Sequence, residues 1–215
     1  MTVDGAAQSP NGQPAMYEYR YADTSSTEFG RIDKPSFLWA GRLYLYTLYL
    51  LFGVSENEWN LSLAGPVLDT FESVHYSLTF RNRKEVVTRA KGQRLRSLDF
   101  DGTSIPSFVL PTSVRQADHV KIEFGNPEIP YVQGVTAILH SVRFEKETKS
   151  LYPELASSSG HEVNAHVITR AKPTKVIVDG NPITDYRSQA QLDGSLRLEI
   201  KLTGSDSQQE LEIFF

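Results

Sequence analysis

The sequence predicts a mainly β protein, an antiparallel β-sandwich preceded by one long buried helix. Three observations carry this prediction. A predominantly apolar run fills residues 35–52, strict alternation of apolar and polar side chains begins at Val74, and three Asp-Gly pairs lie between or beside the alternating runs. Alternation is typical of strands that bury one face. Asp-Gly favours tight hairpin turns, because these residues tolerate positive φ.

The chain divides into three predicted regions. Residues 1–16 are polar and rich in Gly, Ser, Gln and Pro, which predicts a flexible lead-in without the apolar stretch of a secretory signal. Residues 17–63 form a loop followed by the helix, and residues 64–215 form the β-sandwich domain. The loop at 157–160 could divide two sheets or two small sandwiches. Without a signal or a cysteine, a cytoplasmic location is the default expectation.

The predicted helix covers residues 35–52 and is apolar on every side. Pro35 suits a first helical turn, and Gly53 can adopt the left-handed conformation that ends a helix. A helix of this kind must be buried all round. A membrane span needs about 20 apolar residues. The polar groups of Arg42 and Tyr46 interrupt the middle of the run and favour a helix buried in protein, and no membrane association is expected.

Four alternating runs predict strands with one buried face, and no second helical periodicity follows them, so parallel βαβ units are not expected. All pairing from residue 74 to residue 215 is therefore predicted to be antiparallel. The apolar positions of the runs are Val74, Tyr76, Leu78 and Phe80; Val120, Ile122 and Phe124; Leu196, Leu198, Ile200 and Leu202; and Leu211, Ile213 and Phe215.

A weak internal echo links two parts of the predicted sandwich. Thr-Arg-Ala-Lys at 88–91, followed by Asp101-Gly102, recurs as Thr-Arg-Ala-Lys at 169–172, followed by Asp179-Gly180. Short echoes arise readily from common strand chemistry. The pattern predicts two equivalent hairpins in one sandwich rather than a duplicated domain.

Composition excludes several classes of function. The net charge of −4 argues against nucleic-acid binding, which needs a clustered excess of Lys and Arg. The absence of cysteine excludes disulfides, thiolate metal sites and cysteine nucleophiles. The five histidines are scattered and lack the spacing of metal ligands. We therefore expect no metal and no cofactor.

Residues 17–63 resemble the end of a known catalytic fold. Glu28-Phe29, a short polar loop, Pro35 and an aromatic-rich run through Trp39 and Tyr44 are similar to the closing helix of an (α/α)6-barrel, glucoamylase-like glycosidase. The resemblance implies the C-terminal portion of a glycoside hydrolase or an inverting glycoside phosphorylase, with the β-sandwich supporting a barrel. The partner would be that catalytic barrel or a second copy, contacted through the helix at 35–52.

The resemblance also places a catalytic residue. It makes Glu28 the general base that activates water, because this family holds its base just before the last barrel helix. An inverting site needs a second carboxylic acid about 6.5–9.5 Å away, which would lie outside this chain. The family usually has a polar residue between the Glu and the aromatic, and none is present here. The alternative is that Glu28 stabilises a turn or a helix N-terminus.

Three alternating tyrosines, Tyr17, Tyr19 and Tyr21, are candidate substrate-binding residues. Alternation places them on one face of an extended segment. There they could stack against a sugar ring or pack in the core.

Three functional classes remain open from sequence. The first is the C-terminal portion of a carbohydrate-active enzyme, inactive as an isolated chain because its proton donor is missing. The second is a non-catalytic β-sandwich module that binds carbohydrate or a partner protein. The third is a structural or viral assembly protein, because fold alone does not decide function.

Overall fold

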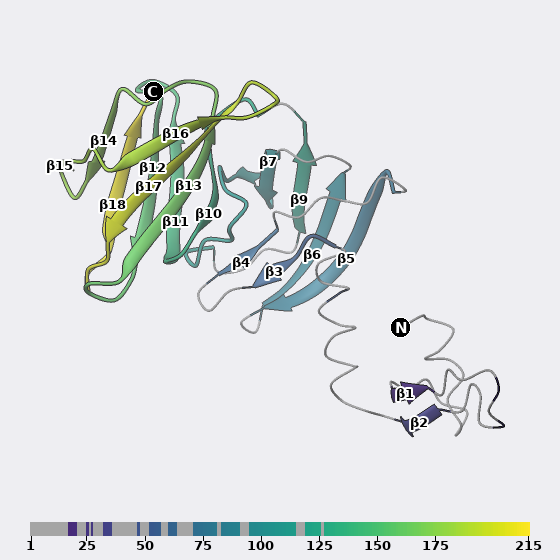
Figure 1. Ribbon diagram of the computed structural model, residues 1–215. Helices are drawn as coiled ribbons and strands as arrows, with labels where there is room; N and C mark the ends of the chain where they lie inside the picture. Colours follow the sequence, from purple (N-terminus) through teal and green to yellow (C-terminus); the bar gives the residue numbers. More distant parts are fainter. Residues whose placement is uncertain are drawn as a thin grey trace. The chain divides into compact units, whose positions relative to one another are not determined.

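The computed structural model describes residues 17–20, 25, 27, 32–35, 47, 52–56, 60–63, 71–80, 83–90, 95–114, 119–125 and 127–215. The chain forms two compact units, Met1–Leu50 and Leu51–Phe215. Every regular element in the described ranges is a strand, which confirms the mainly β prediction (Figure 1). None of these ranges contains a helix long and apolar enough to cross a membrane.

The first unit contains one two-stranded antiparallel sheet. Strand β1 (Tyr17–Arg20) pairs with β2 (Ile32–Pro35), with Tyr19 opposite Asp33. The extended conformation expected for the segment that begins at Tyr17 is therefore present.

The long buried helix predicted at 35–52 is not supported. Pro35 ends strand β2, and Phe52 and Gly53 form a turn in which Gly53 has φ 71°. Between them only Thr47 is described, with helical backbone and an exposed side chain. Proline fixes φ near −65°, which fits the margin of a strand as well as a first helical turn. Its presence therefore could not decide between the two.

The second unit begins with a five-stranded sheet in the order β5-β6-β9-β7-β8, here called the first five-stranded sheet. Its buried apolar side chains include Leu98 on β7 and Val120 and Ile122 on β9. The apolar face predicted for the run at 120–124 is thus confirmed. The strands are β5 (Ser73–Phe80), β6 (Arg83–Ala90), β7 (Leu95–Phe100), β8 (Thr103–Ser104) and β9 (His119–Phe124).

One pair in this sheet is parallel, so the prediction of purely antiparallel pairing from residue 74 onward is wrong here. Strand β9 lies between β6 and β7, with Val86 opposite His119 in a parallel register. A parallel pair needs a long crossover connection, and the chain between Ala90 and His119 supplies it by way of the β7–β8 hairpin. Alternation fixes which side chains are buried but not the direction of the neighbouring strand.

The rest of the second unit is a β-sandwich. A second five-stranded sheet in the order β11-β12-β18-β14-β15 faces a four-stranded sheet in the order β10-β13-β17-β16. The four-stranded sheet contains β10 (Tyr131–Val135), β13 (Glu162–Thr169), β16 (Tyr186–Ala190) and β17 (Leu196–Thr203). The second five-stranded sheet contains β11 (Ile138–Glu145), β12 (Ser150–Ala156), β14 (Lys175–Val178), β15 (Asn181–Pro182) and β18 (Gln209–Phe214).

The sandwich core confirms the predicted alternation. Leu198 and Ile200 from one sheet and Leu211 and Ile213 from the other are buried in one apolar cluster. The loop at 157–160 connects β12 to β13 and therefore joins the two sheets of the sandwich. This is one of the two divisions that the sequence left open.

A short connecting region links the first five-stranded sheet to the sandwich. Strand β4 (Leu61–Ser62) pairs with β3 (Ser55–Glu56), and the Leu63 N–H donates to Phe108 O. The Phe108 N–H in turn donates to Val132 O on β10. Ile168 of β13 lies in the same apolar cluster as the first five-stranded sheet. The two parts therefore share a core.

Buried Asn60 anchors this connection. Its amide nitrogen donates to Ala137 O (2.6 Å) and Val135 O (3.3 Å), and its Oδ1 accepts the Leu139 N–H (3.1 Å). The three backbone groups lie at the corner between β10 and β11. One polar side chain thus satisfies backbone groups far away in the sequence, as burial requires.

The echoed sequences form equivalent hairpins, as predicted. Asp101-Gly102 connects β7 to β8 and Asp179-Gly180 connects β14 to β15, and all four residues have positive φ. In both turns the Asp N–H donates to a backbone carbonyl of the neighbouring central strand, at His119 or Glu210. The N–H of that same residue donates back to the Asp carboxylate. The two hairpins lie in different five-stranded sheets rather than in one sandwich.

Candidate ligand-binding groove

A groove of about 450 Å³ opens at one end of the sandwich. The groove is bounded by residues 127–130 before β10, the turn between β11 and β12, residues 169–171 at the end of β13, and Phe215. Phe215 lies at the C-terminus marked in Figure 1. The ends of strands from both sheets meet here, so the two sheets form the two sides of one concave site.

The floor of the groove is apolar. Phe144 lies among the partly buried side chains packed on the sandwich core, because alternation on β11 sends it inward. Phe215 also packs on this core, and its N–H donates to Lys149 O at 3.1 Å. Pro127 is buried, while Ile129 and Pro130 remain partly exposed. Rigid rings and one branched side chain therefore line the site.

Three exposed cations surround this floor. Lys146 and Lys149 come from the β11–β12 turn and Arg170 follows β13. In the described ranges none of the three has an ion pair. Among the described lining residues, the one side-chain carboxylate is Glu128, which lies 3.4 Å from Arg96 Nη2. The groove is thus locally basic in a chain whose net charge is −4.

Local hydrogen bonds fix the two basic segments. Buried Thr169 donates from Oγ1 to Ala171 O (3.1 Å) and accepts the Ala171 N–H (3.2 Å). This turn holds the backbone of Arg170 between them. On the other side, Lys149 has φ 51°, and Ser150 Oγ donates to Thr148 O at 3.0 Å. Lys149 and Arg170 therefore lie in turns that are stabilised by local hydrogen bonds.

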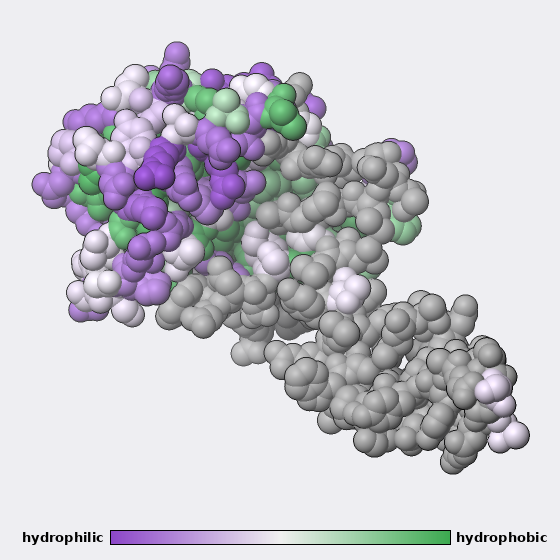
Figure 2. Space-filling view, in the orientation of Figure 1, coloured by the Kyte–Doolittle hydropathy of each residue, from purple (hydrophilic) through white to green (hydrophobic). Residues whose placement is uncertain are grey.

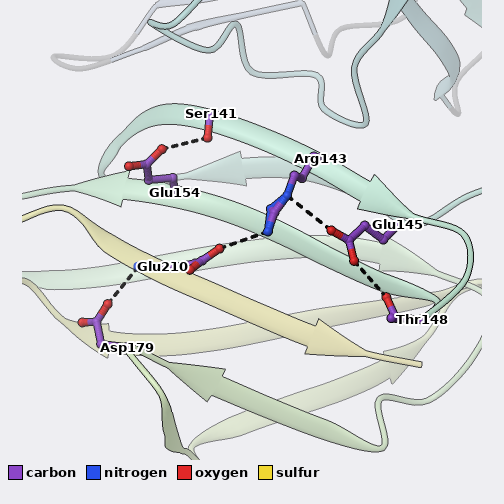
Figure 3. A network of polar contacts seen from close by, with 7 residues as sticks. All are labelled: Ser141, Arg143, Glu145, Thr148, Glu154, Asp179 and Glu210. Carbon is purple, nitrogen blue, oxygen red and sulfur yellow. Dashed lines mark hydrogen bonds and ion pairs between the residues drawn. The ribbon is translucent and has the colours of Figure 1, made fainter.

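The outer face of the second five-stranded sheet carries a different arrangement. Arg143 contacts both Glu145 (3.6 Å) and Glu210 (3.3 Å), while Ser141 donates to Glu154 (Figure 3). The guanidinium also covers the ring of Tyr152, with its carbon 4.0 Å from the ring centroid. Hydrophilic residues dominate the coloured surface of the sandwich in Figure 2. Arg143 on this sheet face thus has two carboxylate partners, whereas the groove cations have none in the described ranges.

His166 lies on the outer face of the four-stranded sheet between two charged neighbours. Arg197 Nη2 donates to His166 Nδ1 (3.1 Å), and Glu199 lies 3.4 Å from Nε2. Burial, followed by the Arg197 cation, lowers the pKa of His166 below its usual value, and the Glu199 carboxylate opposes this only in part. The ring is therefore neutral at pH 7, with its proton on Nε2.

The described structure covers only part of the predicted site residues. Tyr17 and Tyr19 lie on β1, whereas Tyr21 and Glu28 fall outside the described residues. Their proposed roles stay predictions. The sequence reasoning did not identify the groove, although Thr169-Arg170-Ala171 was part of the echo. No local motif brings these residues together with Phe144 and Phe215, because strand pairing does so.

Metal ligation and similarity to known proteins give no further assignment. The described ranges contain no cluster of three or more His, Asp or Glu side chains that could hold a metal ion. No family model, curated protein or solved structure matches the chain. The case for a function therefore depends on the groove and its chemistry.

Proposed function

We propose that the second unit is a non-catalytic β-sandwich module that binds carbohydrate in the groove at the end of the sandwich. The observation that carries the proposal is the apolar, ring-lined floor formed by Phe144, Phe215 and the neighbouring prolines. Ligand sites are usually concave and largely apolar, with volumes of roughly 300–1,000 Å³. The volume of about 450 Å³ falls within this range.

The floor suits a sugar ring. One face of a pyranose exposes several C–H groups, which pack against aromatic and proline rings, while its hydroxyls point outward to polar groups. Phe144 and Phe215 offer rigid apolar surface. Lys146, Lys149 and Arg170 can donate hydrogen bonds from the rim. Apolar packing and peripheral donors are thus available at one site.

The lining favours binding over hydrolysis. Glycoside hydrolysis uses two carboxyl groups on opposite sides of the scissile bond. Among its described residues the groove lining has one side-chain carboxylate, Glu128, which is engaged by Arg96. The module therefore holds sugar without cleaving it.

The resemblance of residues 17–63 supports a wider setting for the module. In this second proposal the chain is the C-terminal portion of a glycoside hydrolase or phosphorylase, Glu28 is the base, and the sandwich supports a catalytic barrel. The two proposals are compatible, since an accessory module can hold the polymer that a barrel cleaves.

The test is calorimetric titration of the full 215-residue chain with soluble oligosaccharides, compared with Phe144→Ala and Phe215→Ala. Each substitution removes a ring from the floor and should weaken binding about tenfold, the effect of losing roughly 1.4 kcal/mol of packing. Phe214→Ala is the matched control, because Phe214 packs edge-on against Tyr152 at 6.4 Å rather than in the groove. Thermal melts identify any variant that fails to fold.

The proposal fails if no oligosaccharide binds, or if Phe214→Ala weakens binding as much as the floor variants. A reducing-sugar assay on the same samples should show no hydrolysis.

A further inference from the structure

We infer that the groove selects a carbohydrate bearing anionic groups, a carboxylate or a sulfate, and that Lys146, Lys149 and Arg170 form its anion-binding rim. This inference rests on the proposed function. It adds the charge of the ligand, which the apolar floor alone does not specify.

The contrast with three cations of the sandwich, Arg143, Lys201 and Arg197, supports the inference. Arg143 contacts two glutamates, Lys201 lies 3.9 Å from Glu162, and Arg197 donates to His166. These side chains have partners within their own sheets. The three groove cations lack an ion pair in the described ranges, and the one side-chain carboxylate of the described lining contacts Arg96. Charge in the groove is therefore available to a ligand.

The side-chain chemistry matches a planar or tetrahedral oxyanion attached to a ring. A guanidinium offers a fork of parallel donors to a carboxylate or sulfate, and an ammonium acts as a point charge. Because the cations lie on two ordered turns on different sides of the floor, the anionic group and the sugar ring can be held together. A free inorganic ion would leave the apolar floor unused.

An acidic peptide carries the same negative charge as an anionic sugar, but on a polypeptide backbone. Its extended backbone needs hydrogen-bond partners along a strand edge, whereas the floor here is composed of rings and branched carbons. We therefore assign the site to an anionic carbohydrate, and the peptide becomes an outcome of the test.

The experiment measures the affinity of the full chain for four probes of matched length. These are an oligogalacturonate, a sulfated oligosaccharide, a neutral oligosaccharide and an oligoglutamate. At least one anionic sugar should bind ten or more times more tightly than the neutral sugar, and its affinity should fall as salt rises. The ratio between the two anionic sugars distinguishes carboxylate from sulfate.

Two charge-removing variants locate the effect. Lys146→Gln and Arg170→Gln should each weaken binding of the anionic sugar about three- to tenfold and that of the neutral probe clearly less, because glutamine keeps a hydrogen-bond donor but loses the charge. Lys175→Gln is the matched control, because Lys175 is an exposed cation on β14 and does not line the groove. Its affinity for every probe should equal that of the wild type.

Each outcome decides a separate claim. If the neutral sugar binds as tightly as the charged ones, the anionic inference fails and the proposed carbohydrate module stands. If no sugar binds, both fail. If oligoglutamate binds as tightly as the anionic sugars, charge alone governs the site and the carbohydrate assignment is overturned.

Discussion

The two five-stranded sheets of the second unit share one strand order but differ in direction. In each, a hairpin (β5–β6 or β11–β12) lies beside a central strand (β9 or β18), which lies beside a second hairpin (β7–β8 or β14–β15). The central strand is parallel to its neighbour β6 in the first sheet and antiparallel to its neighbour β12 in the second. The same order is therefore reached by two different chain paths.

Strand β13 accounts for the difference. In the first sheet the chain passes from β6 directly to β7, so its direction reverses once. In the second it passes from β12 through β13, in the opposite sheet, to β14, so its direction reverses twice. Because β7 and β14 are each antiparallel to the central strand, the extra reversal changes the pairing of that strand with the first hairpin.

The extra strand also helps to form the groove. Residues 169–171, at the end of β13, provide one side of the site, while the β11–β12 turn provides the other. The counterpart of Thr-Arg-Ala at 88–90 ends β6, but only the second copy ends a strand of the facing sheet of the sandwich. Local sequence similarity is therefore sufficient to form the hairpin, whereas the groove also requires the facing sheet of the sandwich.

The largest expected effect tests whether the first five-stranded sheet and the sandwich unfold together. Leu98→Ala and Leu198→Ala each remove a fully buried side chain, one from each apolar cluster, and should each cost about 2–5 kcal/mol of unfolding free energy. Ile168 of the sandwich lies in the first cluster, so either variant should shift a single cooperative transition in urea. Two transitions, with only one shifted, would show that the parts are independent.

The next effect concerns Asn60 in the region that connects the first five-stranded sheet to the sandwich. Asn60→Ala leaves two carbonyls and one N–H without the side chain that they contact, and should cost about 2–4 kcal/mol. Asn164→Ala is the control, because its amide donates to the exposed Glu162 carboxylate and its loss should cost about 0.5 kcal/mol or less. Equal losses in chemical denaturation would contradict the anchoring role of Asn60.

A smaller effect tests the equivalence of the two hairpins. Gly102 (φ 87°) and Gly180 (φ 79°) both have open space where a Cβ would stand, so Ala at either position is opposed mainly by its left-handed backbone. Each substitution should cost about 1 kcal/mol, with the same value at both sites. Gly134→Ala, where φ is not positive and space is also open, serves as the reference. Clearly unequal costs would argue against equivalent turns.

The smallest effect is the pH dependence contributed by His166. Its pKa is lowered in the folded state, so the neutral ring is favoured by folding and its contribution is complete above the unfolded pKa of about 6.5. As the pH falls below that value, the unfolded chain binds the proton first and stability decreases. Unfolding free energies at pH 7.5 and 5.5 should therefore differ less in His166→Gln than in the wild type. An identical pH dependence would exclude this role.

Periodicity in the sequence was sufficient for strands β5, β9, β17 and β18 but not for their arrangement. Leu198 and Leu211 were correctly placed on buried faces, and all three Asp-Gly pairs in hairpin connections. Pro35 was misread, because its fixed φ suits either a strand end or a helix start. The direction of β9 and the groove depend on contacts between distant segments, which no local pattern encodes. No local sequence pattern indicates that Phe144 and Arg170 lie in the same groove.

The most direct test of the account is a nuclear magnetic resonance titration of the full chain with an anionic oligosaccharide. The backbone amides of Glu128, Ile129, Phe215 and residues 144–149 and 169–171 should shift together, with saturation at one affinity. Shifts confined to the outer face around Arg143 and Glu210, or no shifts at any concentration, would contradict the assignment of the groove as the binding site.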